Sequence, residues 1–386
     1  MFNFFIKLCV GIIIAVFALR LIIPKINKTK PGLAPQSVIT LPPENVYPPE
    51  IGYILKQCII DHDVTAIFVQ WICSGAVTVE PGNNLSDTYL IKNGIDKASP
   101  LYQILIYNEL FRNKDKIPLS KITSAYPKIV SDTKKRIAVK YDEMNTRILS
   151  KPVMILQDAV MCAAAFPFAL LIGYGVNAAL NTLWLSALIG AAVFFAGYYL
   201  NTRYCKMIRY RRAYNSEENK NRKNEYRKLE KRTLYILTAE AAAFYGVLIG
   251  AYFVFGKDGF LSVFAFAAAI TGWACTPPIE RLSERGAQLF SELNSFKNFM
   301  KNISAFREKA EFRFHSEPGY FNLVLPYAYA MGVSNAWLNT EIYADKAALP
   351  SIEHKESEKV FSVAFIELTA MFVKALKVKP DKNAKT

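Results

Sequence analysis

The sequence predicts a mainly α-helical membrane protein with about five transmembrane helices. A small winged-helix-like α/β cytoplasmic domain and a helical cytoplasmic C-terminal module complete the predicted architecture. Hydrophobic residues make up 52% of the 386 residues, and they are concentrated in long runs rather than spread evenly. The formal net charge is +15, which in a membrane protein is typical of cytoplasmic loops rich in Lys and Arg.

Five apolar segments are candidate spans, because each approaches the roughly 20 residues that cross a hydrocarbon core. They cover residues 4–23, 153–173, 180–200, 234–255 and 260–275, and the last is short. The first could instead be a cleaved signal peptide. No small-x-small cleavage site follows its apolar core, so an uncleaved anchor is favoured. Gly246 and Gly250 form a GxxxG pattern that permits close helix packing.

The distribution of basic residues predicts the orientation. Residues 201–233 hold twelve basic side chains against four acidic ones, a net charge of +8, whereas the hairpin tip at 174–179 has no charge. Lys25, Lys28 and Lys30 directly follow the first span. By the positive-inside rule these regions face the cytoplasm. We therefore expect a multi-pass protein of the bacterial inner membrane, with the N-terminus outside and the C-terminus in the cytoplasm.

These observations divide the chain into seven regions. They are an anchor at 1–24, a Pro-rich linker at 25–49, the winged-helix-like domain at 50–150, a transmembrane hairpin at 151–200, a basic cytoplasmic helical hairpin at 201–233, a second transmembrane hairpin at 234–276 and the C-terminal helical module at 277–386. Within the last region, amphipathic helices are expected at 282–299 and 357–378.

The 50–150 domain has clear local signals. Helical spacing predicts helices beginning near residues 51, 64 and 101, with Asp63 as the N-cap of the second and Gly75 as its terminator. A fourth helix is expected from about 124 to 149, running into the second span. Alternation at 77–79 and 89–91 predicts a β-hairpin, and this order of elements resembles a winged helix. Trp71 is expected to be buried.

Two groups of charged residues are candidate functional sites. Asp158 and Glu240 lie inside apolar segments, where acids are costly and often functional, although an interfacial or interhelix polar contact explains them as well. Arg209, Arg211 and Arg212 form a basic cluster suited to lipid headgroups, a partner or nucleic acid. The predicted topology alone also accounts for the charge of this cluster.

The aromatic segment at 320–337 is a candidate interface between modules. Its side chains are too apolar for an exposed loop, and a helix is expected to begin at Pro326, where a missing N–H costs nothing. Tyr327 and Trp337 should be buried, either where this segment joins the two cytoplasmic modules or in a local C-terminal core.

Enzyme signatures are absent from the sequence. The six cysteines include no CxxC pair, and none has ligand spacing with the three histidines. GxSxG, Walker and GxGxxG patterns are also absent. Asp61, His62 and Asp63 are adjacent, but neighbours on a turn rarely converge on one metal ion. We therefore expect no enzyme activity, no cofactor and no metal site.

Four stretches resemble the YciQ-like predicted membrane proteins of bacteria, the family of domain of unknown function 2207. They are Pro48-Pro49-Glu50, Asp63-Val64-Thr65-Ala66 up to Gly75, Arg281-Leu282-Ser283-Glu284-Arg285-Gly286 with Phe296-Lys297-Asn298-Phe299, and Leu325-Pro326-Tyr327-Ala328 with Met331-Gly332-Val333 and Trp337. The resemblance covers roughly residues 42–340. It implies a membrane protein without established catalytic residues. Family members typically carry an extracytoplasmic β-rich domain before the first span, and we expect this chain to lack it.

Three functions are compatible with this sequence. The favoured one is a membrane-anchored interaction or scaffold protein, which contacts a bilayer with anionic headgroups and binds an unidentified cytoplasmic protein. The second is a component of a small-solute or ion transporter that uses Asp158 and Glu240. The third is a membrane-tethered nucleic-acid-binding regulator, although acids nearly balance the bases of the 50–150 domain and argue against strong DNA binding. The sequence does not indicate an oligomeric state.

Overall fold

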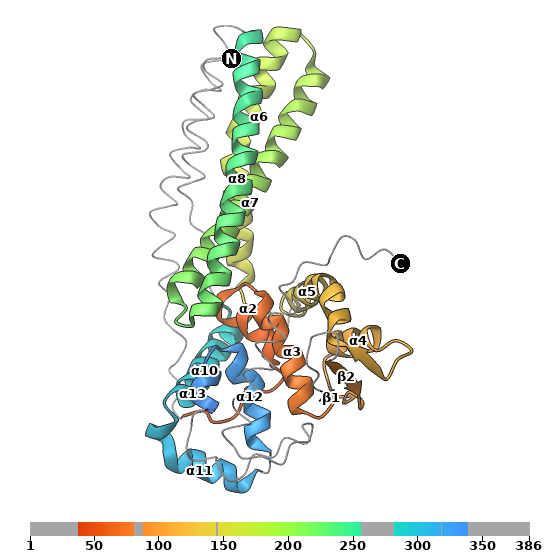
Figure 1. Cartoon of the computed structure of the whole chain (residues 1–386). Helices are drawn as coiled ribbons and strands as arrows, with labels where there is room; N and C mark the ends of the chain where they lie inside the picture. The colour runs from red at the N-terminus through yellow and green to blue at the C-terminus, as the bar shows by residue number, and fades with distance from the viewer. Residues whose placement is uncertain (1–37, 81–87, 144–145, 256–281, 318, 339–386) are drawn as a thin grey trace. The chain divides into compact units, whose positions relative to one another are not determined.

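The computed structural model describes residues 38–80, 88–143, 146–255, 282–317 and 319–338. These residues are mainly helical, as predicted, with one small sheet (Figure 1). The chain divides into two compact units. Of the described residues, unit 1 contains 149–217, 223–255 and 282–284, and unit 2 contains 38–148, 218–222 and 285–338. The predicted spans at 4–23 and 260–275 and the predicted helix at 357–378 lie outside the described residues.

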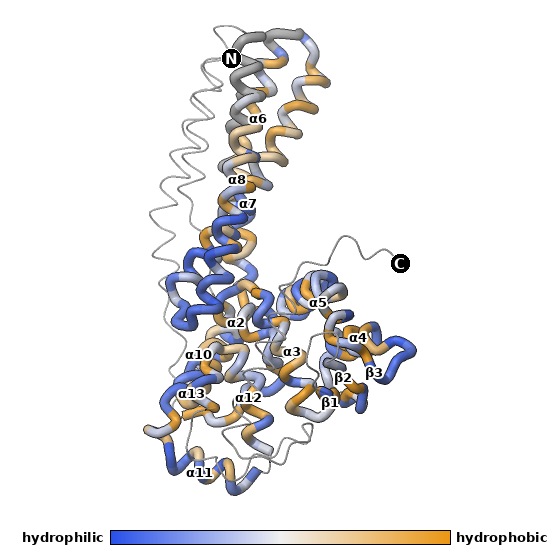
Figure 2. Tube along the Cα trace, in the orientation of Figure 1, coloured by the Kyte–Doolittle hydropathy of each residue, from blue (hydrophilic) through white to orange (hydrophobic). Residues whose placement is uncertain are grey.

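Unit 1 contains long helices that match the predicted positions of three spans. They are α6 (Lys151–Leu180), α7 (Leu183–Ser216) and α8 (Lys220–Phe255), whose first residues belong to unit 2. Among the described residues, only α7 has the length and apolar composition needed to cross a membrane. The first half of α7 is hydrophobic and its second half is hydrophilic (Figure 2).

Small residues bring α6 and α7 close together. A Cβ added to Gly173 would lie 3.1 Å from the backbone oxygen of Ser186, and one added to Gly190 would lie 3.1 Å from that of Ala169. Gly173 and Gly190 therefore provide the close helix packing that the sequence predicted for Gly246 and Gly250. A Cβ at Gly246 would meet nothing within 4 Å in the part of the chain that the structure describes.

The turn between α6 and α7 is shorter than predicted. The expected tip at 174–179 is wrong, because α6 continues to Leu180 and α7 begins at Leu183. Asn181 ends α6 with a φ of 49°, a left-handed conformation that asparagine adopts more readily than most residues.

Unit 2 combines a three-stranded sheet with short helices. Its first part contains η1 (Pro48–Glu50), α2 (Ile51–Lys56), α3 (Asp61–Cys73), β1 (Val77–Glu80), β2 (Tyr89–Lys92), α4 (Leu101–Leu110), β3 (Lys116–Pro118) and α5 (Leu119–Lys140). Its last part contains α10 (Glu284–Lys301), η2 (Ile303–Phe306), α11 (Arg307–Ser316), α12 (Tyr320–Ala330) and α13 (Ser334–Leu338). The sheet is antiparallel in the order β1-β2-β3, and Val79 pairs with Leu90, which pairs with Ile117.

Three predictions for the 50–150 region need correction. The fourth helix does not reach the second span, because α5 ends at Lys140 and α6 begins separately at Lys151. The third strand, β3, was not predicted, because three residues are too few for a visible alternation. Asp63 is not an N-cap: α3 begins two residues earlier, and the Asp63 carboxylate accepts the N–H of Ile60 at 2.9 Å from inside the helix.

The helix predicted to begin at Pro326 begins earlier. Gly319, with a φ of 85°, precedes α12, and Pro326 lies inside that helix. Proline in a helix interior costs about 3 kcal/mol. Burial offsets this cost, because α12 packs along α3 and its side chains at 324, 325, 328 and 330 are fully buried. The predicted burial of Tyr327, Trp337 and Trp71 is confirmed.

Candidate functional site

The first candidate site in unit 2 is a buried ion pair between Asp63 and Arg222. The Asp63 side chain is 0% exposed and that of Arg222 is 3% exposed. Arg222 Nη1 lies 2.8 Å from Asp63 Oδ1 and also donates to the carbonyl of Ala330 at the end of α12. Asp63 Oδ2 accepts the Ile60 N–H. One carboxylate therefore connects the start of α3, the end of α12 and the start of α8.

The turn between α7 and α8 positions Arg222. Asn219 Oδ1 accepts the backbone N–H groups of Asn221 and Arg222, as a helix-capping residue does, and Asn219 Nδ2 donates to the carbonyl of Gly332 at 3.1 Å. Gly332 has a φ of 73°, and a Cβ there would lie 2.9 Å from Arg222 Cδ. Glycine is thus required at this position by both its conformation and its neighbours.

Burial and hydrogen bonding act in opposite directions on Asp63. Burial raises the pKa of the Asp63 carboxyl, while the charge of Arg222 and the Ile60 N–H lower it. Gly52 of α2 lies against this carboxylate, and a Cβ at Gly52 would lie 2.1 Å from Asp63 Oδ2. The pair therefore has no room for a substrate, and its geometry is that of a structural link.

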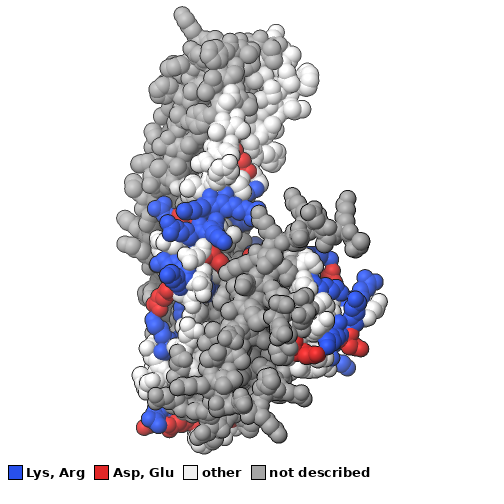
Figure 3. Space-filling view, viewed as in Figure 1, with Lys and Arg blue, Asp and Glu red and all other residues white. Residues whose placement is uncertain are grey.

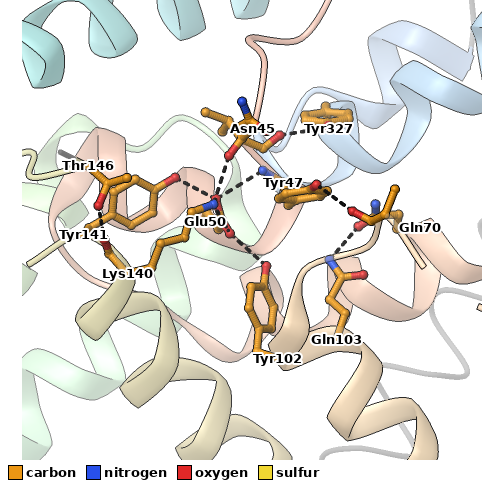
Figure 4. Close-up of polar contacts among 12 residues, drawn as sticks. Asn45, Tyr47, Glu50, Gln70, Tyr102, Gln103, Lys140, Tyr141, Thr146 and Tyr327 are labelled. Atoms are coloured by element: carbon orange, nitrogen blue, oxygen red, sulfur yellow. Dashed lines mark hydrogen bonds and ion pairs between the residues drawn. The ribbon is translucent and has the colours of Figure 1, made fainter. Parts of the chain in front are cut away.

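Glu50 is the second buried carboxylate of unit 2, with 0% exposure (Figure 4). Its oxygens accept hydrogen bonds from Tyr102 Oη at 3.1 Å, Tyr141 Oη at 2.6 Å and the Tyr47 N–H at 3.3 Å. Lys140 Nζ lies 2.8 Å from Oε2. Burial, followed by the charge of Glu50, raises the pKa values of Tyr102 and Tyr141, so both hydroxyls stay protonated and donate. This centre connects η1 with α4 and α5.

The adjacent residues Asp61, His62 and Asp63 point to different partners. Asp61 pairs with Lys134 at 3.1 Å, and the ring of His62 stacks on Tyr329 with ring centroids 4.2 Å apart. Within the described residues, no group of three or more His, Cys, Asp or Glu side chains is placed to hold a metal ion.

Asp158 and Glu240 form separate contacts in unit 1. Asp158 of α6 accepts a hydrogen bond from Tyr198 Oη of α7 at 3.3 Å and is exposed. Glu240 of α8 lies 3.9 Å from Arg203 of α7. The other carboxylate oxygen of Glu240 is buried and has no hydrogen-bond partner among the described residues. Both acids thus form interhelix polar contacts, one of the two interpretations that the sequence left open.

The basic cluster lies on the hydrophilic half of α7. Arg211 is exposed and lies 3.9 Å from Glu230 of α8, and Arg212 is also exposed, whereas Arg209 is partly buried. Lys and Arg side chains gather over this half of α7 and the start of α8 (Figure 3). This surface directly follows the apolar half of α7 in the sequence.

The three residues proposed as a module interface lie in the core of unit 2. Tyr327 Oη donates to the carbonyl of Val46 at 2.9 Å, and the Tyr327 ring contacts Phe296 of α10. Pro326 is buried in α12. Trp337 is fully buried and stacks on Phe321 with centroids 5.9 Å apart. These contacts connect α12 with α10 and with the segment before η1.

Residues of the resembling stretches, including Glu50, Asp63, Tyr327 and Gly332, thus lie at the contacts that hold unit 2 together. Residues 206–340 match the family described as the C-terminal domain of the DUF2207 predicted membrane proteins. The predicted resemblance is confirmed over these 135 of the 386 residues. No curated protein matches the chain, and no solved structure matches it.

The DUF2207 match supports a membrane location and indicates no specific activity. The matched range contains Arg222 and Gly332, whereas Glu50 and Asp63 lie before it. The ion pair therefore joins the matched range to the preceding part of unit 2. The sequence analysis named Glu50 only as part of a resembling stretch and did not single out Lys140 or Arg222. The only local signal was the position of Glu50 directly after two prolines.

Proposed function

We propose that this DUF2207-like protein is a membrane-anchored interaction protein and that unit 2 binds a protein partner. The observation that carries this proposal is the Asp63–Arg222 pair. Residues 218–222 belong to unit 2, while the flanking parts of α7 and α8 belong to unit 1. A buried ion pair costs desolvation energy and is better suited to fixing one arrangement than to adding stability. A partner bound to unit 2 would thus be connected, through residues 218–222, to the parts of α7 and α8 that belong to unit 1.

An exposed apolar surface on unit 2 supports a binding role. Leu101, Leu105 and Val139 are 68%, 40% and 63% exposed. Leu101 and Leu105 are one helical turn apart on α4, and Val139 lies near the end of α5. Exposed apolar groups that gather on one face are typical of interaction sites.

The membrane arrangement is the second part of the proposal. Five spans with the N-terminus outside the bacterial inner membrane fit the apolar segments and the +8 charge of residues 201–233. Leu183→Cys, at the first residue of α7, should react with a membrane-impermeant maleimide added to intact cells. Lys220→Cys should react only after permeabilisation. The protein without added cysteine is the control, and the reverse pattern would contradict this orientation.

Site-specific photocrosslinking tests the interaction itself. A photoreactive amino acid at Leu105 or Val139 should give discrete protein adducts in native membranes. The same amino acid at Lys309, an exposed position of α11 in the same unit, should not. Adducts that are absent at all three positions, or equal at all three, would contradict a partner-binding face.

Nucleic-acid binding through a winged helix receives less support. The helix that precedes the β1–β2 hairpin is α3, and it would be the helix that enters a groove. Its residues 63–69 are all buried. The helix therefore has little free surface to offer to a base edge.

A transporter component is the alternative that one observation favours. One oxygen of Glu240 is buried without a hydrogen-bond partner among the described residues, as an acid that exchanges protons would be. Proteoliposomes containing the Glu240→Gln protein should then lose a proton flux that the native protein shows. Equal leak from both would exclude this role for Glu240.

A further inference from the structure

A cavity of about 570 Å³ lies between the start of α4 and the second half of α5. Its volume falls in the range of roughly 300–1,000 Å³ that is typical of ligand sites. Tyr47 and Tyr102 contribute aromatic wall, Leu101 and Val139 contribute aliphatic wall, and Lys135 and Arg136 contribute positive charge. Leu101 and Val139 also belong to the exposed apolar surface that supports a binding role for unit 2.

The Glu50 centre fixes one wall of the cavity. Tyr102 and Lys140 both line the cavity and both bind the buried carboxylate of Glu50 (Figure 4). Lys140 Nζ also lies 5.2 Å from the centre of the Tyr47 ring. These polar groups already have protein partners, so this wall is rigid and offers mainly the flat sides of its side chains to an occupant.

The charges that remain available are at the rim. Lys135 and Arg136 are exposed, and neither forms an ion pair with any residue that the structure describes. Glu143 also lines the cavity, and its carboxylate offsets one of these two positive charges. Because Glu50 neutralises Lys140, the rim has a net charge of +1. An anionic group next to an aliphatic or aromatic side chain would complement this surface.

We propose that this cavity binds an acidic peptide segment of the partner protein. An aliphatic side chain of the peptide fills the cavity beside Leu101 and Val139, and neighbouring carboxylates contact Lys135 and Arg136. This inference rests on the proposed interaction function and specifies its partner. A bilayer surface is the less suitable occupant, because headgroups on a flat surface contact the two cations but leave a concave apolar cavity unfilled.

Fluorescence anisotropy on the full chain in nanodiscs of zwitterionic lipid tests the proposal. The probe is a fluorescein-labelled peptide of eight residues that alternates Glu and Leu. It should bind more tightly than a Glu/Ser peptide, which lacks the apolar anchor, and more tightly than a Lys/Leu peptide, which has the opposite charge. Empty nanodiscs measure binding to lipid.

Matched variants assign the binding to this cavity. Lys135→Glu combined with Arg136→Glu should weaken binding of the Glu/Leu peptide at least about tenfold, a loss of roughly 1.4 kcal/mol. Lys121→Glu combined with Lys309→Glu makes the same charge change at exposed positions outside the cavity and should leave the affinity within about twofold. Val139→Ser should weaken the Glu/Leu peptide but leave the Glu/Ser peptide unchanged.

Several outcomes would overturn the proposal. Equal binding by both charge-reversed variants, or by the Glu/Leu and Lys/Leu peptides, would mean that the cavity does not recognise acidic peptides. If vesicles of anionic lipid, but not the peptide, protect Lys135 from acetylation, the surface binds membrane instead. Crosslinking from Val139 without peptide binding would refute the acidic peptide and keep the interaction function. Peptide binding without crosslinking would refute that function in native membranes.

Discussion

Removing one partner of the buried Asp63–Arg222 pair should strongly destabilise unit 2. Arg222→Met removes the guanidinium that lies 2.8 Å from a fully buried carboxylate. Removing one partner of a buried pair costs about 3–5 kcal/mol, because the remaining charge is left without compensation. That cost corresponds to an increase of roughly 10²- to 10⁴-fold in the opening equilibrium. The double variant Asp63→Asn/Arg222→Met leaves no buried charge and should be more stable than Arg222→Met alone.

The thiol of Cys73 reports the opening of unit 2. Cys73 is the last residue of α3, is 6% exposed, and has its pKa raised to about 12 by burial. It should therefore react with a maleimide only when α3 is released, at a rate that follows the opening equilibrium. The assay uses the full chain in nanodiscs, with its other cysteines replaced. Lys301→Met is the matched control.

The Lys301→Met control removes an ion pair of the same turn that is exposed instead of buried. Lys301 pairs at 2.7 Å with Glu218 of the same α7–α8 turn, but these side chains are 48% and 69% exposed. Removing such a pair should cost at most about 1 kcal/mol. A labelling rate for Arg222→Met close to that of Lys301→Met would refute the argument that the buried pair links the α7–α8 turn to α3.

The effect of pH provides an independent check. Burial raises the folded-state pKa of Asp63, and Arg222 is the largest effect that opposes this rise. In Arg222→Met, the folded pKa lies further above the unfolded value of about 3.9. A group with a raised folded pKa favours folding below its unfolded pKa, and this contribution is lost as pH rises through the folded pKa. The loss of folding stability caused by Arg222→Met should therefore become smaller as the pH falls from neutral. The loss of stability in the double variant should not become smaller.

Three further predictions can be tested with the same thiol assay. Trp71→Ala should lower the free energy of unfolding by about 3–5 kcal/mol, because Trp71 is 2% exposed and its ring packs edge-on against Tyr107 with ring centroids 5.1 Å apart. The control Phe312→Ala, at a side chain that is 66% exposed, should lower it by less than about 0.5 kcal/mol. Gly52→Ala should destabilise by about 1–3 kcal/mol through its clash with the Asp63 carboxylate, although alanine in a helix interior is normally favoured by about 1 kcal/mol. Glu50→Gln should cost about 1–3 kcal/mol, since one amide cannot accept from two tyrosines and a lysine. Equal labelling rates for Trp71→Ala and Phe312→Ala would contradict the prediction for Trp71. A labelling rate for Gly52→Ala below that of the native protein would contradict the predicted clash. An unchanged rate for Glu50→Gln would contradict the prediction for the Glu50 centre.

Local patterns in the sequence predicted the parts of unit 2 that local physics determines. The helical face that contains Trp71 and the terminator Gly75, which has a φ of 75°, locate α3. The alternation of Val77 and Val79 locates β1. Each signal lies within a few residues of the element that it specifies. The same local rule failed at Pro326, because burial of α12 against α3 outweighs the preference of proline for the first helical turn.

The two buried centres could not be predicted in the same way. Arg222 is one of twelve basic residues in 201–233, and nothing adjacent in the sequence distinguishes it from the exposed Arg211. Its partner Asp63 is 159 residues away. Glu50 and Lys140 are likewise 90 residues apart. Only the fold brings these charges together, and single-sequence reasoning has no access to contacts of that range.

The stretches that resemble the DUF2207 proteins therefore have structural explanations that need no catalysis. Gly286 is required because a Cβ there would lie 2.3 Å from the backbone oxygen of Ile148, and Gly332 is required by the approach of Arg222. Glu50 and Asp63 have their oxygens occupied by partners from distant elements. Recognition of a partner then falls to side chains outside these contacts. On unit 2, Lys135, Arg136 and Val139 combine exposure with a cavity, which is why the charge reversal at that cavity is the most direct test of specificity.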